Sequence, residues 1–254
     1  MREINLANAP KEPKVRLQKE LSPKEHIDAI IEKTFEELSK LGTESGDSPK
    51  NGCKSRLIFP SKRDIDKKGK PIVRYSEQEL RFLFVEQFNE YCRKHKLGWF
   101  YSVETPTRDT YSGFSGQNAK PKQDNGGQSA MIDLVIHNEN LQRIALIEFK
   151  ALNPDKTCYW KDFVKLNNEP SKEYDGKTEE ECKNTELPLT YFVMYVENHA
   201  TKTENSIKEK LCPPENDKQY TKGKNIFFWC FDINTKEYYD TNTFKFTLKS
   251  PGKD

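Results

Sequence analysis

Three charged residues interrupt two consecutive apolar segments in the middle of the chain. The stretch "SAMIDLVIHNENLQRIALIEFKAL" (129–152) reads as two strands joined by a polar turn, and it contains Asp133, Glu148 and Lys150. Alternate side chains of a strand project to the same face, so Glu148 and Lys150 share one face. Asp133 lies beside them if the two strands pair in antiparallel orientation through the turn "HNENLQ".

These residue types suit a particular chemistry. Two carboxylates that meet at one point repel each other, and burying them without a counter-charge is costly. A divalent cation removes that cost, and Mg²⁺ prefers one or two carboxylates together with waters and a phosphate. A lysine beside the metal can orient or deprotonate an attacking water, or stabilise charge on a phosphate in the transition state. The pattern therefore predicts metal-assisted phosphodiester hydrolysis with Mg²⁺, for which Mn²⁺ could substitute.

The pattern Glu-x-Lys is by itself common in a chain with 32% charged residues, and it begins at Glu12, Glu148 and Glu181. The copy at Glu148 differs because it lies within an apolar strand and has an aspartate on the strand before it. The alternative is an edge strand with a solvated Glu/Lys face. The run "IALIEF" is apolar on both faces up to Glu148, which favours the functional interpretation.

Composition limits the remaining possibilities. The 254 residues allow one large domain or two small ones, and 15 Phe, 11 Tyr and 3 Trp can form a core. The net charge of +2 means that affinity for nucleic acid must come from local basic patches. Six cysteines without a CxxC pair indicate reduced thiols. No apolar segment is long enough to span a membrane or act as a secretory signal, so we expect a soluble cytoplasmic protein.

Helical and strand patterns alternate along the chain and indicate an α/β fold, with a mixed central β-sheet flanked by helices. Residues 1–54 are expected to form an N-terminal extension with one amphipathic helix (22–42), and residues 55–254 the main domain. That helix could pack on the main body or on a second copy, so a homodimer is possible. The segment 106–128 is predicted to be a long loop. Further helices are expected at 76–95, 156–169 and 203–212, and strands at 98–105, 131–137, 143–152, 187–197, 225–233 and 244–249.

The arrangement of Asp133, a turn and Glu148-Phe149-Lys150 resembles the PD-(D/E)XK nuclease superfamily. Its restriction-endonuclease-like core, ordered helix, three strands, helix, strand (αβββαβ), is similar to the order expected here from Ser76 to Glu197. Ile132 stands where many members have a proline. The stretches "RYSEQELRF", "YSVETPT", "YSGFSG", "SAMIDLVI", "IEFKALN" and "KDFVKLNNE" also resemble an uncharacterised bacterial group within the superfamily.

The resemblance implies a further glutamate from the first core helix. With about 100° per residue, Glu77 falls on the apolar face of helix 76–95, whereas Glu79 points away. We therefore expect Glu77 to join Asp133 and Glu148 around the metal, with Glu79 as the alternative. The competing interpretation is that Glu77 is simply a first-turn acid favoured by the helix dipole.

Basic residues near these positions are candidates for binding nucleic acid. Lys161 and Lys165 lie one turn apart on the helix after the motif and could hold phosphates, or form a solvated face with Asp162. Lys120, Lys122 and Arg108 lie in the predicted loop and could neutralise a nucleic-acid backbone, or serve only solubility.

Together, these features predict a Mg²⁺-dependent nuclease that acts on nucleic acid, with DNA as the expected substrate and endonuclease cleavage as the expected mode. Two alternatives remain. The same fold could be an inactive module that binds nucleic acid or a protein. The chain could also be a structural protein that dimerises through the helix 22–42.

Overall fold

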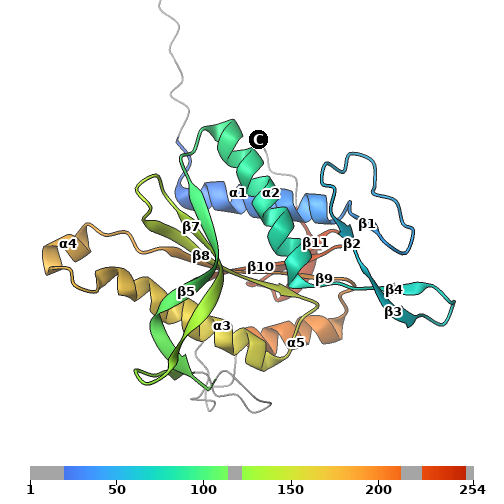
Figure 1. The fold of residues 1–254 in the computed structure, drawn as a ribbon. Coiled ribbons are helices and arrows are strands. Elements are labelled where there is room, and N and C mark those ends of the chain that lie inside the picture. The colour runs from blue at the N-terminus through green and yellow to red at the C-terminus, as the bar shows by residue number, and fades with distance from the viewer. Residues whose placement is uncertain (1–19, 114–121, 213–224, 250–254) are drawn as a thin grey trace, which may run out of the picture.

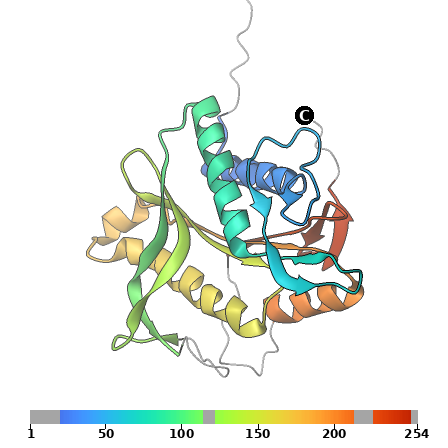
Figure 2. The ribbon, with the colours of Figure 1, turned by 45° about the vertical axis from the view of Figure 1, so that its right-hand side comes forward.

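The computed structural model describes residues 20–113, 122–212 and 225–249. In these ranges the chain forms three layers, with a mixed β-sheet between two layers of helices (Figure 1). Helices α1 (Pro23–Leu38) and α2 (Glu77–His95) cover one face of the sheet. Helices α3 (Lys156–Asn168) and α5 (Thr201–Leu211) cover the other, as Figure 2 also shows. The predicted α/β class with a mixed sheet flanked by helices is confirmed.

The central sheet has eight strands in the order β12-β11-β10-β9-β8-β7-β5-β6. Strands β8 (Arg143–Ala151), β9 (Leu189–Val196) and β10 (Ile226–Asp232) are parallel, because α3 and α5 provide the crossover connections. Strand β7 (Gln128–His137) runs antiparallel to β8 and to β5 (Phe100–Ser112). The remaining strands of the sheet are β6 (Lys122–Gln123), β11 (Glu237–Asp240) and β12 (Lys245–Leu248).

Smaller elements lie outside this sheet. Strand β1 (Gly42–Thr43) pairs in parallel with β2 (Ile58–Phe59). Strands β3 (Ser61–Ile65) and β4 (Pro71–Val73) form a separate antiparallel ribbon. A 3₁₀ helix, η1 (Glu169–Tyr174), and the short helix α4 (Glu179–Lys183) lie between α3 and β9.

Local signals place the starts of the long helices where the sequence predicts them. The backbone N–H of Ser22 donates to Glu25 Oε2 at 2.7 Å, and that of Ser76 donates to Glu79 Oε2 at 3.0 Å. Both predicted capping boxes are therefore present. Helix α1 ends at Leu38, before the predicted Gly42, because the chain turns there toward β1.

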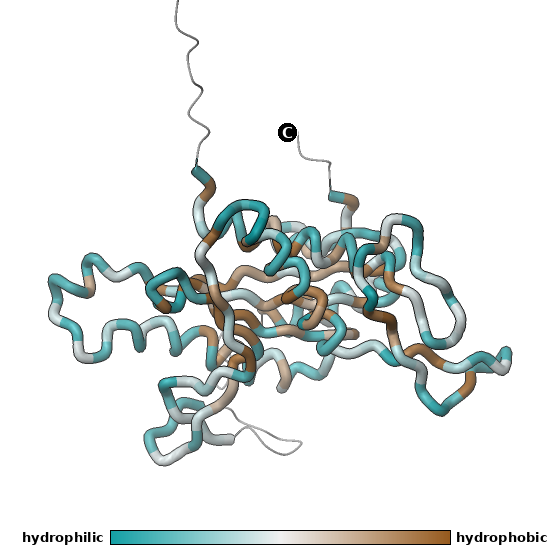
Figure 3. The backbone as a smooth tube through the Cα atoms, turned by 45° about the horizontal axis from the view of Figure 1, so that its top comes forward, coloured by the Kyte–Doolittle hydropathy of each residue, from teal (hydrophilic) through white to brown (hydrophobic). Residues whose placement is uncertain are grey.

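Two apolar layers hold the sheet between the helices. On the α1–α2 side, Phe84 packs against Phe149 of β8, and Phe35 stacks on Phe231 of β10. On the α3 side, a second cluster is formed mainly by aromatic and aliphatic residues of α3, β9 and β10. Figure 3 shows that hydrophobic residues are concentrated in the central strands and that hydrophilic residues lie at the periphery. The second cluster includes Tyr159, Trp160, Phe163, Leu166, Phe192, Met194, Val196 and Cys230.

The prediction of a loop over 106–128 was wrong for most of the residues of this segment that the structure describes. Strand β5 continues to Ser112, and Tyr111 pairs with Gln128 of β7. Its polar residues Thr107, Asp109 and Tyr111 are buried rather than solvated. The buried carboxylate of Glu169 accepts hydrogen bonds from this strand. These bonds offset the free-energy cost of burying the polar groups of the strand. A pattern search based on apolar periodicity could not detect such a strand.

The apolar stripe of α1 is buried within this chain. Ile27, Ile30 and Phe35 have no exposed surface and belong to the same cluster as α2 and the sheet. The predicted division at residue 54 remains a prediction, although α1 shares the core of the main body. In the described ranges, no helix combines the length and apolarity needed to cross a membrane.

Candidate active site

Strands β7 and β8 separate at the point where the charged residues lie. Their paired residues run from His137 and Arg143 to Leu134 and Ile147. Beyond this point β7 stays paired with β5, whereas β8 stays paired with β9. Asp133 and Glu148 are the residues that follow the last pair on each strand, so both lie where the strands separate. We call this opening the β7–β8 fork.

Side chains satisfy the backbone groups that the separation leaves unpaired. The carboxylate Oδ2 of Asp133 accepts from the backbone N–H of Phe149 at 2.8 Å. The ammonium of Lys150 donates to the carbonyl of Phe149 at 2.8 Å, and that of Lys165 donates to the carbonyl of Met131 at 2.8 Å. The fork is therefore held open by the charged residues themselves.

Helix α3 adds two charged residues to the fork. Lys165 Nζ lies 2.5 Å from Glu148 Oε1 and 2.9 Å from Asp162 Oδ1. The other oxygen of Asp162, Oδ2, lies 2.9 Å from Lys150 Nζ. Glu148, Asp162 and Lys165 are all buried, with Glu148 only 1% exposed. Carboxylates and ammonium groups thus alternate through the fork, and each negative group has a positive neighbour.

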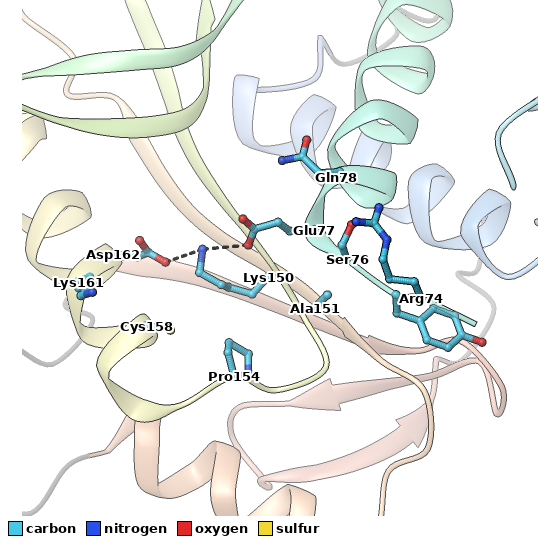
Figure 4. Close-up of a pocket in the computed structure, with 11 residues that line it drawn as sticks. Arg74, Ser76, Glu77, Gln78, Lys150, Ala151, Pro154, Cys158, Lys161 and Asp162 are labelled. Carbon is cyan, nitrogen blue, oxygen red and sulfur yellow. Dashed lines mark hydrogen bonds and ion pairs between the residues drawn. The ribbon is translucent and has the colours of Figure 1, made fainter. Parts of the chain in front are cut away.

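Helix α2 brings Glu77 to the same place. Its Oε2 atom lies 3.4 Å from Lys150 Nζ, as Figure 4 shows. The side chain of Glu77 is 43% exposed, so the expectation that it lies inside the buried face was wrong. The buried acid is Glu79, whose carboxylate turns back to cap the helix at Ser76 and pairs with Arg74. Glu77 is therefore the glutamate of α2 that reaches the fork, and Glu79 has a capping role.

On the β5 side, Arg81 approaches Asp133. Its Nη1 atom lies 4.0 Å from Asp133 Oδ1, and the guanidinium also pairs with Glu104 and Gln78. With all groups ionised, the fork contains five carboxylates against Lys150, Lys165 and Arg81. The formal excess is two negative charges, which equals the charge of one divalent cation. The carboxylates are Glu77, Glu104, Asp133, Glu148 and Asp162.

Burial and neighbouring charges shift the pKa values in opposite directions. Burial, followed by the charge of Asp162, raises the pKa of Glu148 well above its ordinary value, although Lys165 opposes the shift. The pKa of Asp162 is lowered, because Lys165 and Lys150 outweigh its burial. The pKa of Lys150 is raised, because the carboxylates around it outweigh its burial. These surroundings favour the ammonium form of Lys150, and a further cation beside Glu148 would favour its ionised form.

A cavity of about 490 Å³ opens beside this cluster (Figure 4). Lys150 and Asp162 form its inner wall, and Glu77 lies at the first turn of α2. Lys161, one of the lysines expected to hold a phosphate, also lines the cavity on the α3 side. Glu148 lies behind Lys150 and Asp162 rather than on the cavity wall.

The donors at the fork fit a hard divalent cation in type and charge. Oxygen ligands are what Mg²⁺ prefers, and it needs only one or two carboxylates when waters and phosphate complete its shell. In the described part of the chain, no three acidic, His or Cys side chains already stand close enough together to enclose a metal ion. The buried oxygens of Glu148 and Asp162 are instead paired with the ammonium of Lys165.

The other predicted nucleic-acid contacts are distributed differently. Lys165 is buried in the fork and is not available to a phosphate in this arrangement. Arg108 pairs with Glu173 at 2.9 Å, beside η1, and Lys122 is exposed on the edge strand β6. Lys120 lies outside the described residues. Of these lysines and arginines, Lys161 is the one that lines the cavity.

The sequence alone assigns Asp162 only to a solvated face shared with Lys161 and Lys165. Helical spacing could have identified it, because Asp162 lies three residues after the core residue Tyr159 and next to Phe163. Lys165 follows Asp162 by three residues and therefore projects from the same side. An acid and a base at this spacing on an apolar face indicate a buried ion pair.

Comparisons with protein-family models, with curated proteins and with solved structures returned no significant match for this chain.

Proposed function

We propose that this protein is a Mg²⁺-dependent nuclease that hydrolyses phosphodiester bonds at the β7–β8 fork. The observation that carries the proposal is the position of Asp133, Glu148 and Lys150 where two strands separate, with Asp133 bound to the N–H of Phe149 and Lys150 on the wall of an open cavity. A cluster with excess negative charge in a partly buried place is costly unless a cation joins it. Hydrolysis of a phosphate ester uses such a cation directly.

Each residue has a separate role in the proposed reaction. Asp133 and Glu148 would hold the metal from neighbouring strands, and Glu77 would contribute from the rim of the cavity, directly or through a water. A bound Mg²⁺ supplies Lewis-acid stabilisation of the phosphate and lowers the pKa of a coordinated water. Lys161 would bind a phosphate of the substrate at the cavity.

Lys150 acts as a charged donor in this proposal. Its raised pKa keeps the ammonium protonated, so it orients the attacking water and stabilises negative charge on the phosphate. Asp162 holds Lys150 in place from α3, at 2.9 Å.

The arrangement of α2, β5, β7, β8, α3 and β9 supports a restriction-endonuclease-like core as part of this proposal. The helix, three pairing strands, crossover helix and parallel strand occur in that order. The charged residues lie where the second and third of these strands separate. This position matches the residues through which the sequence resembles PD-(D/E)XK nucleases.

A cleavage assay tests the proposal. The protein is incubated with end-labelled DNA and RNA, single- and double-stranded, in Mg²⁺, in Mn²⁺ and in EDTA. We expect cleavage of DNA in either metal, none in EDTA, and loss of about 10³-fold or more in Lys150→Ala. Lys183→Ala is the matched control, because it removes the lysine of the exposed Glu181-x-Lys183 copy of the motif.

The outcomes separate the alternatives. Equal activity in Lys150→Ala and in the wild-type protein would show that the nuclease activity comes from another site or a contaminant. Binding of a nucleic acid without cleavage in any metal would identify an inactive binding module. Lys165 gives that alternative a physical basis, because its ammonium already pairs with Glu148.

A further inference from the structure

The β3–β4 ribbon is a separate structural feature beside the candidate active site. It forms its own two-stranded sheet, with Ser61 opposite Val73 and Ile65 opposite Pro71. Figures 1 and 2 show it extending from the layered body near the start of α2. Residues 62–72 are all exposed. The ribbon is therefore not held by the core, and its side chains are available to a partner.

The charge of the ribbon differs in sign from that of the rest of the chain. Residues 61–74 contain six lysines and arginines against two aspartates, a net charge of +4. Since the whole chain has a net charge of +2, the other residues together carry −2. No ion pair joins these cations to a described carboxylate, apart from that of Arg74 with Glu79. The other five cations are Lys62, Arg63, Lys67, Lys68 and Lys70.

Two isoleucines are exposed among these cations. Ile65 is 65% exposed and Ile72 is 38% exposed, one on each strand of the ribbon. Large aliphatic side chains on a projecting, positively charged ribbon are not explained by solubility. They fit a surface that makes apolar contacts within a strongly anionic partner.

The turn at the tip of the ribbon is structurally defined. Asp66 Oδ1 accepts from the backbone N–H groups of Lys68 and Lys70, at 2.8 and 2.9 Å. The N–H of Asp66 also donates to the carbonyl of Lys70 at 2.7 Å. The three lysines at the tip are thus presented by an ordered turn.

The ribbon leads directly into the cavity. After β4 the chain passes through Arg74 and Tyr75 to Ser76 and Glu77, and all four residues line the cavity (Figure 4). From Arg74 to the tip is about five residues, or about 16 Å of extended strand. The base of the ribbon therefore adjoins the candidate active site.

We propose that the β3–β4 ribbon is a binding arm that enters the major groove of double-stranded DNA. The major groove of B-form DNA, about 12 Å wide and 8.5 Å deep, admits a two-stranded ribbon. The cations neutralise phosphates on both sides of the groove, and the isoleucines contact thymine methyl groups at its floor. The major groove of double-stranded RNA is too narrow for such an arm, and single strands have no groove. The choice of nucleic acid as the partner rests on the proposed nuclease function.

Binding measurements without a divalent metal test this arm separately from cleavage. Fluorescence anisotropy in EDTA is used with labelled duplex DNA of about three helical turns, and with single-stranded DNA and duplex RNA of equal length. We expect the wild-type protein to bind duplex DNA more tightly than the other two. A protein without this preference contradicts the groove assignment.

Two sets of variants distinguish the charges from the isoleucines. Changing Lys67, Lys68 and Lys70 to Ser is expected to weaken duplex binding about tenfold or more, and to reduce the slope of log K against log salt by about 3. Ile65→Ser with Ile72→Ser is expected to weaken duplex binding with an unchanged salt slope. The control changes three exposed lysines elsewhere, Lys177, Lys183 and Lys202, to Ser.

Each result bears on one of the two proposals. Ribbon-dependent binding of duplex DNA without cleavage in any metal supports the arm and contradicts the nuclease function. Metal-dependent cleavage by a protein whose ribbon variants bind and cut normally supports the nuclease and overturns the arm. Ribbon-dependent self-association in place of DNA binding, seen by sedimentation, also overturns the arm.

Discussion

Two buried glutamates on the α3 side of the sheet are held in contrasting ways. Glu148 in the fork and Glu169 at the end of α3 are each 1% exposed. Glu169 accepts from the backbone N–H groups of Arg108 and Asp109, both at 3.0 Å, and from Tyr111 Oη at 3.2 Å. The Nη1 atom of Arg143 also lies 3.3 Å from Glu169 Oε2.

The partners of Glu148 are ammonium groups at the ends of flexible side chains. Lys165 is shared between Glu148, Asp162 and the carbonyl of Met131, and Lys150 completes the cluster from the same strand. Backbone amides cannot leave Glu169 unless the fold changes, whereas a lysine can rotate away when another cation arrives. The comparison therefore separates a structural carboxylate from one that is suited to exchange its counter-ion.

The largest expected effect is on cleavage, in Glu148→Gln. This change keeps the size of the side chain and removes its charge, so cleavage should fall about 10³-fold or more. The free energy of unfolding should fall less than it does in Glu169→Ala, because the glutamine keeps the size of the side chain and an acceptor oxygen for Lys165. Cleavage rates and urea denaturation measure the two effects. A large loss of stability would place Glu148 in the same class as Glu169.

Glu169→Ala should produce the reverse result. It leaves two backbone N–H groups and the Arg143 guanidinium buried without their acceptor, which costs about 3 kcal/mol or more. Urea denaturation measures this loss, and Glu180→Ala, at an exposed position of α4, is the control. A loss no greater than that of the control would mean that Glu169 is not a structural anchor.

Lys165→Met tests whether the internal ammonium competes with a metal. The variant keeps an unbranched side chain but removes the cation beside Glu148, so Mn²⁺ should bind about tenfold more tightly, equivalent to about 1.4 kcal/mol. Calorimetric titration with Mn²⁺, and the rise in melting temperature that Mn²⁺ causes, are the two measurements. Lys161→Met, one turn earlier on α3, is the control. Unchanged or weaker Mn²⁺ binding would contradict the competition.

Glu37 is a third buried carboxylate, and its contribution to stability should depend on pH. Hydrogen bonds from the backbone N–H groups of Ser55 and Lys54 outweigh its burial and lower its pKa. A carboxyl whose pKa is lower in the folded state stabilises the fold above its ordinary value of 4.5, and this contribution is lost as the pH falls through the folded pKa. Glu37→Gln should therefore reduce stability at neutral pH by about 1 kcal/mol and flatten its decline below about pH 4.5. An unaltered pH profile of unfolding would refute this account.

Several elements could be predicted because their causes are local. Ser22 with Glu25, and Ser76 with Glu79, form contacts three residues apart that are visible in the sequence. The apolar strands around Asp133 and Glu148 were also located correctly, within a few residues. Strand β11 and the β3–β4 ribbon were missed, because strands of three to five residues are too short to show a periodic pattern.

The sequence by itself determined the α/β class and the long helices, since periodicity and capping act over a few residues, and it made Asp133, Glu148 and Lys150 the candidate site residues. Only the tertiary structure decided that β5 extends to Ser112, because its buried polar groups depend on Glu169, about 60 residues away. It also decided that Asp162 and Lys165 turn inward, since their partners lie on strands that separate at the fork. Charges in an apolar sheet are stable only with partners from distant segments, and sequence periodicity contains no information about those partners.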